Sequence, residues 1–199
     1  IKEISYQQEP YSIMWAVRDD GALLGCTYRR DQDVVAWHRH LTGATVASGD
    51  YKIPDKGFFE SVATIPHPDG DQDQIWFIVK RTINAVTKRF VEYMEKIDPD
   101  SLKLEMDCAL SYDGVAATTI SGLSHLNGET VKVVGDGAVY ENEVVASGQI
   151  VVDPSVLKAN VGLELLPKIK TMRMESTQFG TAQNVPKRPN RIVVRVYKS

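Results

Sequence analysis

Cysteine is scarce in this chain of 199 residues, which has only two, Cys26 and Cys108. They stand far apart, each in an apolar, strand-like run, and neither belongs to a CxxC pair or a cysteine–histidine cluster. That spacing excludes the usual sequence pattern of a structural zinc site. We expect two buried free thiols, and a disulfide between them is the alternative that the sequence leaves open.

Long apolar runs and an excess of one charge are also missing. No run approaches the roughly 18 residues that a membrane-spanning helix needs, so we expect no membrane anchor. The formal net charge is -3 and the isoelectric point is about 5.8, which gives no electrostatic basis for a protein that coats nucleic acid. Because strand-like patterns run up to both ends, we expect the chain to be a fragment of a longer protein.

Strand signals dominate what is present, and they predict an all-β protein. Ser12–Arg18 and Leu23–Arg29 are predicted strands joined by the tight-turn signal Asp19–Gly21. A third strand, Val34–His40, follows a polar turn at Asp31–Asp33. If the fold is a β-propeller, we expect these three strands to be the second to fourth strands of one blade.

A second group of strands begins after the polar, glycine-rich stretch Gly43–Gly57, which we expect to be a loop. Phe58–Ile65 is its first strand and ends at two prolines, which cannot donate to a central ladder. Ile75–Arg81 and Lys88–Met94 are expected to form a hairpin across Thr82–Thr87.

The two groups of strands share a tryptophan-centred pattern. Trp15 and Trp76 each lie in an apolar strand whose partner carries an aromatic residue, and each pair lies near an Asp-Gln-Asp tripeptide. A spacing of roughly 60 residues suits consecutive blades of a β-propeller, and an ordinary antiparallel sheet is the alternative. We expect both tryptophans to be core anchors. The strand Arg191–Tyr197 would complete the second blade beside Lys88–Met94.

The pattern changes after Asp98, where the predicted strands become short and closely spaced. Tyr112–Gly114 is a turn signal, and Asp153-Pro154 separates two of the later strands. This spacing predicts a small closed β-barrel over residues 98–170, inserted into a partial propeller-like domain of residues 1–97 plus 171–199. The short strands of the barrel are Thr130–Val134, Val139–Val145, Gln149–Val152 and Asn160–Leu163.

Histidines supply one candidate metal site. His38 and His40 stand at i, i+2 on one face of a predicted strand, and that spacing can place two imidazoles on one metal ion. No third ligand is evident from the sequence, although Asp31, Asp33 or His67 could approach. The alternative is a solvated polar face on an outer strand.

Alternating aspartates supply a second candidate metal site. Asp69, Asp71 and Asp73 resemble the start of a calcium-binding loop. The motif then fails, because Gln74 replaces its glycine and Lys80 its bidentate glutamate. An exposed hairpin turn is therefore the favoured interpretation.

A catalytic set is not evident in the sequence. There is no nucleophile elbow, no activated cysteine and no glycine-rich phosphate loop, and Glu92 and Glu95 have no evident acid–base partner. We expect a protein that is not an enzyme and that needs no cofactor. Two short basic clusters are too small to define a nucleic-acid site, and solvated strand ends are favoured. Their residues are Lys80, Arg81, Lys88, Arg89, Lys187, Arg188 and Arg191.

Three runs of the chain resemble parts of known proteins. Trp15–His40 and Phe59–Glu95 resemble segments of tail proteins of tailed bacteriophages and prophages. Gly122–Val152 resembles the small barrel of the first catalytic cysteine half-domain of the ubiquitin-activating enzyme. That second likeness concerns shape and implies no ubiquitin chemistry, because function belongs to sites and not to folds.

The first resemblance implies a tail-tube or nozzle-like structural protein of a short-tailed phage. Such a protein would carry propeller-like β domains and form a homo-oligomeric ring around the DNA exit channel, with other tail proteins as partners. It would be made in the bacterial cytoplasm and reside in the virion. A mildly acidic chain suits non-specific passage of DNA, because adhesion to DNA requires lysine and arginine at the phosphates.

Two other functions stay open. The inserted barrel could be a host-surface binding module for a glycan or a protein, which would need exposed aromatic residues, and it offers only Tyr112 and Tyr140. A tail-associated hydrolase would need a cleft with paired carboxylates or a histidine-backed nucleophile. An open, shallow and partnerless face at His38 and His40 would exclude it.

Overall fold

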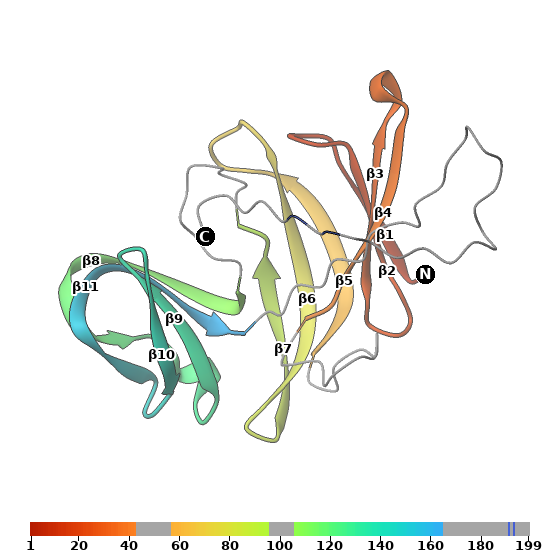
Figure 1. The fold of residues 1–199 in the computed structure, drawn as a ribbon. Helices are drawn as coiled ribbons and strands as arrows, with labels where there is room; N and C mark the ends of the chain where they lie inside the picture. Colours follow the sequence, from red (N-terminus) through yellow and green to blue (C-terminus); the bar gives the residue numbers. More distant parts are fainter. Residues whose placement is uncertain (43–56, 96–105, 165–190, 192, 194–199) are drawn as a thin grey trace. The chain divides into compact units, whose positions relative to one another are not determined.

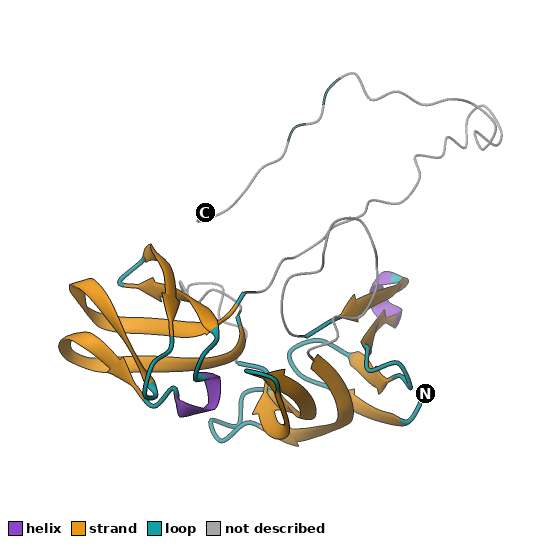
Figure 2. Cartoon of the chain, turned by 90° about the horizontal axis from the view of Figure 1, so that it is seen from below, coloured by secondary structure: helices purple, strands orange, loops and turns teal. Residues whose placement is uncertain are grey.

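The structure, a computed structural model, describes residues 1–42, 57–95 and 106–164, together with Arg191 and Val193. The chain divides into two compact units, Ile1–Leu166 and Pro167–Ser199, and nearly all of the second lies outside the described residues. The described elements are β-strands and two three-residue 3-10 helices, Arg30–Gln32 and Ser124–Leu126. The predicted all-β class is therefore confirmed. The strands form three antiparallel sheets, here called A, B and C (Figures 1 and 2).

Sheet A is a four-stranded meander in chain order. The three strands predicted from the sequence are its second to fourth strands, as expected, and a short strand precedes them. Between the second and third strands the turn needs glycine at Gly21, where φ is +81° and the ring of Phe58 occupies the space of a side chain. The strands are β1 Glu3–Gln7, β2 Ile13–Val17, β3 Leu23–Arg29 and β4 Val34–His40.

Sheet B is a three-stranded meander of β5 Gly57–Pro66, β6 Asp73–Ile83 and β7 Val86–Tyr93. The predicted order of strands is confirmed, but the β6–β7 turn is tighter than predicted. It consists of Asn84 and Ala85, both with positive φ, so the strands extend further into the predicted loop. The fourth strand predicted at Arg191–Tyr197 falls on residues of which only Arg191 and Val193 are described, and its pairing stays a prediction.

Sheets A and B pack face to face over one apolar core. Their inner faces are also joined by a hydrogen bond from Ser5 Oγ to Thr64 Oγ1 at 2.7 Å. The backbone N–H of Val62 donates to Glu3 Oε2 at 3.0 Å. Each large apolar side chain buried here contributes about 1.5–3 kcal/mol. The core residues are Ile13, Trp15, Val17, Leu23, Phe59, Val62, Ile75, Phe77 and Val79.

The two tryptophans of the repeated pattern occupy different environments. Trp15 is 2% exposed, and its indole N–H donates to Gln7 Oε1 at 3.0 Å, so its prediction as a core anchor is confirmed. The same prediction for Trp76 is wrong. Side chains alternate along β6, and burial of Ile75 and Phe77 in the A/B core turns Trp76 to the opposite face. There its ring contacts the ring of Tyr93 at a tilt of 40°, with centroids 5.2 Å apart.

Sheet C is an open sheet of four strands in the order β10-β9-β11-β8, and no closed barrel is found in the described residues. The predicted strands Gln149–Val152 and Asn160–Leu163 are the two ends of one strand, β11. Irregular pairing with β8 carries the strand through Asp153-Pro154 where the sequence predicted a break. The predicted turn Tyr112–Gly114 likewise lies inside β8. The strands are β8 Asp107–Ser121, β9 Thr130–Gly135, β10 Ala138–Val144 and β11 Gln149–Leu163.

A second apolar core lies against sheet C and is separate from the A/B core. Ile83 of β6 belongs to it, and Phe90 of β7 packs against it. The backbone N–H of Asn84 also donates to Glu129 Oε1 at 2.7 Å. The domain boundary predicted near residue 98 lies outside the described residues, so the division into residues 1–97 plus 171–199 and 98–170 stays a prediction. The central buried residues are Ile120, Leu123, Leu126, Val131, Val133, Val145, Ile150, Val152, Val156 and Val161.

Candidate functional site

Sheet A turns an apolar face away from sheet B. Residues paired across antiparallel strands share a face, so the register defines rows of side chains that cross the sheet. In these rows Arg39 is the only charged residue, and Tyr6, Tyr28 and Trp37 are 57%, 54% and 59% exposed. We call this surface the outer face of sheet A. Its rows are Ile4, Ala16, Leu24, Arg39; Tyr6, Met14, Cys26, Trp37; and Tyr28, Val35.

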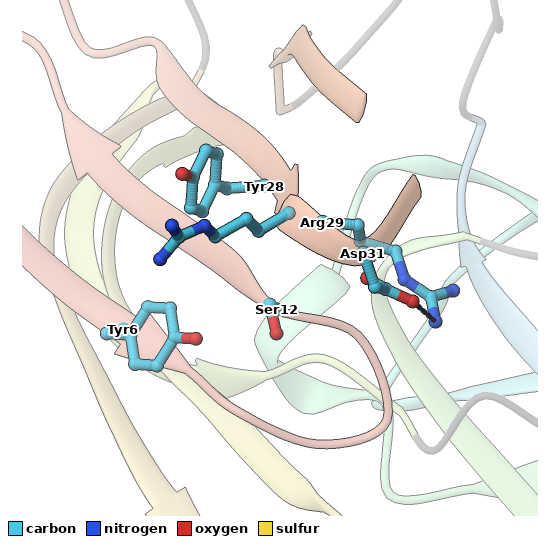
Figure 3. A pocket seen from close by; sticks show the side chains of 6 residues that line it. Tyr6, Ser12, Tyr28, Arg29 and Asp31 are labelled. Atoms are coloured by element: carbon cyan, nitrogen blue, oxygen red, sulfur yellow. Dashed lines mark ion pairs between the residues drawn. The ribbon is translucent and has the colours of Figure 1, made fainter. Parts of the chain in front are cut away.

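An open hollow of about 730 Å³ lies at one end of this face (Figure 3). Tyr6 and Tyr28 contribute aromatic rings, and Arg29 and Asp31 contribute an ion pair with 3.8 Å between Nη2 and Oδ2. Aromatic rings beside charged groups and hydroxyls can stack on a sugar ring and hydrogen-bond its hydroxyls. Arg30 and Ser12 complete the lining of the hollow.

Sheet B also has an exposed outer face, with one apolar and one charged half. Val91 and Tyr93 are 70% and 49% exposed in the apolar half. In the charged half, Lys80 Nζ lies 4.6 Å from the ring centroid of Phe58. The register gives the rows Ile65, Gln74; Ala63, Trp76, Tyr93; Ser61, Ile78, Val91; and Phe58, Lys80, Arg89, which we call the outer face of sheet B.

The candidate pair His38 and His40 lies on the inner face of β4, at the edge of the A/B core. Nδ1 of His38 and Nε2 of His40 are 2.7 Å apart, so the N–H of one ring donates a hydrogen bond to the nitrogen of the other. Both rings contact Trp15, with centroid distances of 5.5 and 5.2 Å. The ring of His38 occupies the space above Gly25, where a Cβ atom would come within 2.0 Å of it. The expected solvated polar face is therefore a half-buried aromatic contact.

Burial disfavours the charged form of both imidazoles. Desolvation lowers the pKa of His38, and desolvation followed by the charge of His38 lowers the pKa of His40 to about 4. Thr27 Oγ1 lies 3.4 Å from His38 Nε2. In the described residues, no Asp31, Asp33 or His67 side chain joins the two histidines as a third metal ligand. The predicted metal site on this pair therefore lacks the ligands that the sequence offered for it.

The structure gathers a different set of metal-binding side chains on the β5–β6 turn. Ligand atoms of His67, Asp69 and Asp71 lie within 4.8 Å of one another, and His67 Nδ1 is 3.5 Å from Asp69 Oδ2. Asp73, the third aspartate of the predicted calcium loop, is outside this group. Its Oδ2 accepts the backbone N–H groups of Gln8 and Glu9 at 2.7 and 3.1 Å, so it fastens the β1–β2 loop.

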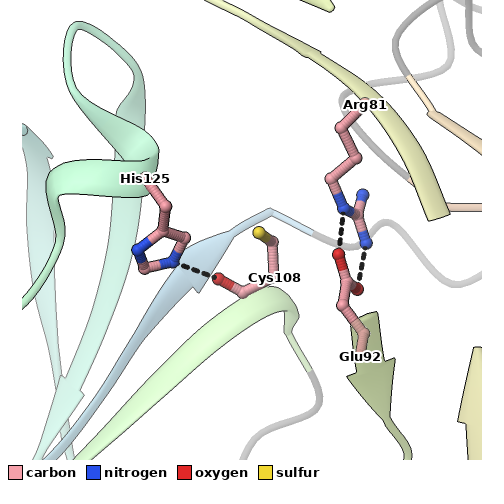
Figure 4. Close-up of polar contacts among 4 residues, drawn as sticks. All are labelled: Arg81, Glu92, Cys108 and His125. Atoms are coloured by element: carbon pink, nitrogen blue, oxygen red, sulfur yellow. Dashed lines mark hydrogen bonds and ion pairs between the residues drawn. The ribbon is translucent and has the colours of Figure 1, made fainter. Parts of the chain in front are cut away.

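The basic cluster predicted on the β6–β7 hairpin is divided between the two faces of sheet B. Arg81 is 1% exposed and makes two hydrogen bonds of 2.6 Å to Glu92 (Figure 4). Burial acts to lower the pKa of Arg81, but its bonds to Glu92 outweigh that effect and raise it. On the outer face, Arg89 pairs with Glu60 at 2.6 Å. Alternation therefore leaves no continuous basic patch on the hairpin.

The two cysteines are buried free thiols, as predicted. Desolvation, followed by the charge of Glu92, raises the pKa of Cys108 to about 12, so its nucleophilic thiolate is suppressed near neutral pH. His125 approaches Cys108 only through the backbone carbonyl, with 3.3 Å between Nε2 and the oxygen (Figure 4). The arrangement is therefore not a cysteine–histidine catalytic pair.

Neither a scan of protein-family models nor a search of curated proteins finds a match for this chain. In the residues that the structure describes, no helix has the length and apolar character to cross a membrane.

The features that sequence reasoning missed are the two outer faces. Their rows follow from strand register, and for sheet A the signal in the sequence was the apolar character of both alternating residue sets along β2 and β3.

Proposed function

We propose that this chain is a non-catalytic structural component of a phage or prophage tail, and that it forms part of a ring around the DNA exit channel. The observation that carries this proposal is the stack of two meander sheets, each of which has exposed apolar side chains on its outer face. A scaffold of this kind offers wide, rigid surfaces for assembly. The proposed partners are further copies of the protein and other tail proteins, the proposed location is the virion, and synthesis occurs in the bacterial cytoplasm.

A propeller-like arrangement is the finer fold that this proposal includes. A blade of a β-propeller is a four-stranded meander that packs against a neighbouring blade on each face. Sheet A has that strand order, with one face packed in the A/B core and apolar side chains on the other face. Sheet B supplies three strands in the same order. These features support consecutive blades. In place of the small closed barrel that the sequence predicted, the described residues form the open sheet C.

Charge pairing in sheet B agrees with passage of DNA. A surface that holds DNA needs lysine and arginine side chains directed at the phosphates. Arg81 and Arg89 are instead bound to Glu92 and Glu60. The formal net charge of -3 points the same way.

A host-surface binding module is the second candidate function. The version predicted for the barrel loses support, because Tyr112 and Tyr140 are partly buried and pack against the core of sheet C. The hollow at Tyr6 and Tyr28 on sheet A is the place in the described residues that favours it, since two exposed rings flank an arginine there. Glycan-array binding that disappears on substitution of Tyr6 and Tyr28 by alanine would support this candidate over the structural one.

Tail incorporation tests the leading proposal. Phage particles from cells that carry the gene are purified on a density gradient, probed with antibody to this chain, and viewed by immunogold electron microscopy. We expect the antibody to label the tail. A premature stop codon at Trp15 should give particles without a complete tail. Expression of a suppressor tRNA that reads this stop codon should restore the complete tail. Particles that lack the protein but remain normal would overturn the proposal.

A further inference from the structure

We propose that the turn between β5 and β6 binds a divalent transition-metal ion, Zn²⁺ in the first place, through His67, Asp69 and Asp71 (Figure 1). One ligand atom from each of these side chains lies within 4.8 Å of the other two. Imidazole nitrogen and carboxylate oxygen both coordinate Zn²⁺, at about 2.0–2.2 Å. This inference goes beyond the proposed structural role and does not depend on it, because one turn of one chain supplies all three ligands.

The third ligand decides which class of metal suits this turn. The sequence pattern of Asp69, Asp71 and Asp73 is that of an all-oxygen calcium loop, but Asp73 is hydrogen-bonded to the β1–β2 loop and lies outside the group. His67 takes its place. Carboxylates alone favour Ca²⁺ and Mg²⁺, whereas an imidazole nitrogen favours Zn²⁺ and other transition metals. The exchange of an aspartate for a histidine therefore changes the expected metal from calcium to zinc.

A hydrogen bond within the turn orients His67 for metal binding. The backbone N–H of Asp69 donates to His67 Nδ1 at 3.1 Å, so this nitrogen presents a lone pair and carries no proton. A metal ion binds imidazole through such a lone pair and would replace the amide hydrogen there. The side chain of His67 is 16% exposed and that of Asp69 is 63% exposed. The histidine is therefore the fixed ligand, and the aspartate has room to rotate onto the ion.

The separation of His67 and Asp69 fits two ligands of one tetrahedral ion. Nδ1 and Oδ2 lie 3.5 Å apart, beyond the usual length of an N–H···O hydrogen bond. Two ligands that are each about 2.1 Å from a tetrahedral ion lie roughly 3.4 Å from one another. Asp71 is exposed, so rotation of its side chain can bring a carboxylate oxygen to the third position. Water would fill the fourth position, as in other zinc sites with three protein ligands.

The backbone of the turn is already closed around these side chains. The N–H of His67 donates to the carbonyl of Gln72, and the N–H of Gly70 donates to the carbonyl of His67, both at 2.8 Å. The turn is also tied to the β1–β2 loop, because the N–H of Asp73 donates to the carbonyl of Glu9 at 3.0 Å. An ion bound here would therefore fasten one end of the A/B stack. Because the unfolded chain does not hold the three ligands together, the ion should also stabilise the fold.

Zinc titration of the 199-residue chain, prepared without a histidine tag, tests the inference. Isothermal titration calorimetry should show saturable binding of Zn²⁺. Thermal unfolding followed by tryptophan fluorescence should move to higher temperature as the Zn²⁺ concentration rises above the dissociation constant. His67→Asn and Asp69→Asn should each weaken Zn²⁺ binding at least about tenfold, since even the hydrogen-bond partners of metal ligands cost that much when they are replaced.

Two matched variants separate this turn from other groups that could bind zinc. Asp19→Asn removes the same charge from another exposed turn, and His40→Gln removes an imidazole from the other histidine pair. Circular dichroism first establishes that every variant is folded. Both control variants should bind Zn²⁺ as the wild-type chain does.

Three results would overturn the inference. The first is a wild-type chain without saturable Zn²⁺ binding. The second is Zn²⁺ binding that His67→Asn retains and His40→Gln loses, which would assign the metal to the histidines of β4. The third is binding of Ca²⁺ in preference to Zn²⁺ that His67→Asn leaves unchanged, which would identify a calcium loop formed by the aspartates alone. Tail incorporation is decided separately by the particle experiment.

Discussion

At the scale of single residues, His40 shows how a polar side chain is held at the edge of an apolar core. It is hydrogen-bonded to His38 at 2.7 Å and lies against Trp15. The residue pattern of β4 could predict that the two histidines share a face. It could not predict the gap above Gly25 that lets His38 reach Trp15, because that contact depends on which residues of β2, β3 and β4 are paired.

Stability should depend on pH through His40. The imidazole has a pKa of 6.5 in its ordinary state and about 4 in the fold, so the unfolded chain binds more protons between these values. The free energy of unfolding therefore has its full value above about pH 6.5 and decreases as the pH falls towards about 4. Because the ring is partly hydrated, we expect this decrease to be roughly 2 kcal/mol. Urea unfolding followed by tryptophan fluorescence at a series of pH values measures this loss.

The matched control for this titration is His40→Gln, which keeps a polar side chain at the position but cannot take up a proton. Its stability should fall less steeply with acid than that of the wild-type chain, while the smaller effect of His38, whose pKa is also lowered, remains. If the free energy of unfolding fell equally steeply with acid in both proteins, protonation of His40 would not be the cause of the acid destabilisation.

At the scale of elements, strands were predicted accurately where the turn signals in the sequence correspond to real turns. Strands β2 to β7 are bounded by short local signals, so their order and approximate limits could be predicted from the residues alone. In sheet C the same reasoning was misled, because Asp153-Pro154 and Tyr112–Gly114 look like turns but lie within long strands. Irregular pairing of β8 with β11 overrides those local preferences, and a sequence by itself does not give strand pairing.

The β6–β7 turn offers a test of local strain at this scale. Ala85 has a φ of +62°, in the left-handed region that costs a residue with a side chain about 1–2 kcal/mol. Ala85→Gly would relieve that strain and create Asn-Gly, the preferred pair for such a turn, but it adds freedom to the unfolded chain. We expect a net stabilisation of about 0.5–1 kcal/mol in urea unfolding.

Ala63→Gly is the matched control for the turn, because Ala63 is an exposed residue inside β5 with extended backbone. Glycine there should destabilise the protein by about 0.5–1 kcal/mol. If both substitutions were destabilising, the turn would not hold Ala85 in the left-handed conformation.

At the scale of the whole molecule, the described residues contain two separate apolar cores, one between sheets A and B and one against sheet C. The three tryptophans of the chain, Trp15, Trp37 and Trp76, all belong to sheets A and B. Tryptophan fluorescence therefore reports on sheets A and B, whereas far-ultraviolet circular dichroism reports on strands of all three sheets. Two cores that unfold independently should give transitions that do not coincide between these two signals.

Substitutions placed in one core at a time test whether the cores are coupled. Val17→Ala removes two buried carbons from the A/B core, and Val133→Ala removes the same atoms from the core of sheet C. Each should cost about 1–3 kcal/mol, since a cavity adds to the lost burial. If the cores unfold independently, Val17→Ala should lower the unfolding midpoint measured by fluorescence. Val133→Ala should leave that midpoint unchanged and lower only the midpoint of the dichroism transition that belongs to sheet C. Ile83 and Phe90 reach from sheet B into the core of sheet C, so a fluorescence midpoint that falls equally in both variants would mean that these contacts join the cores into one cooperative unit.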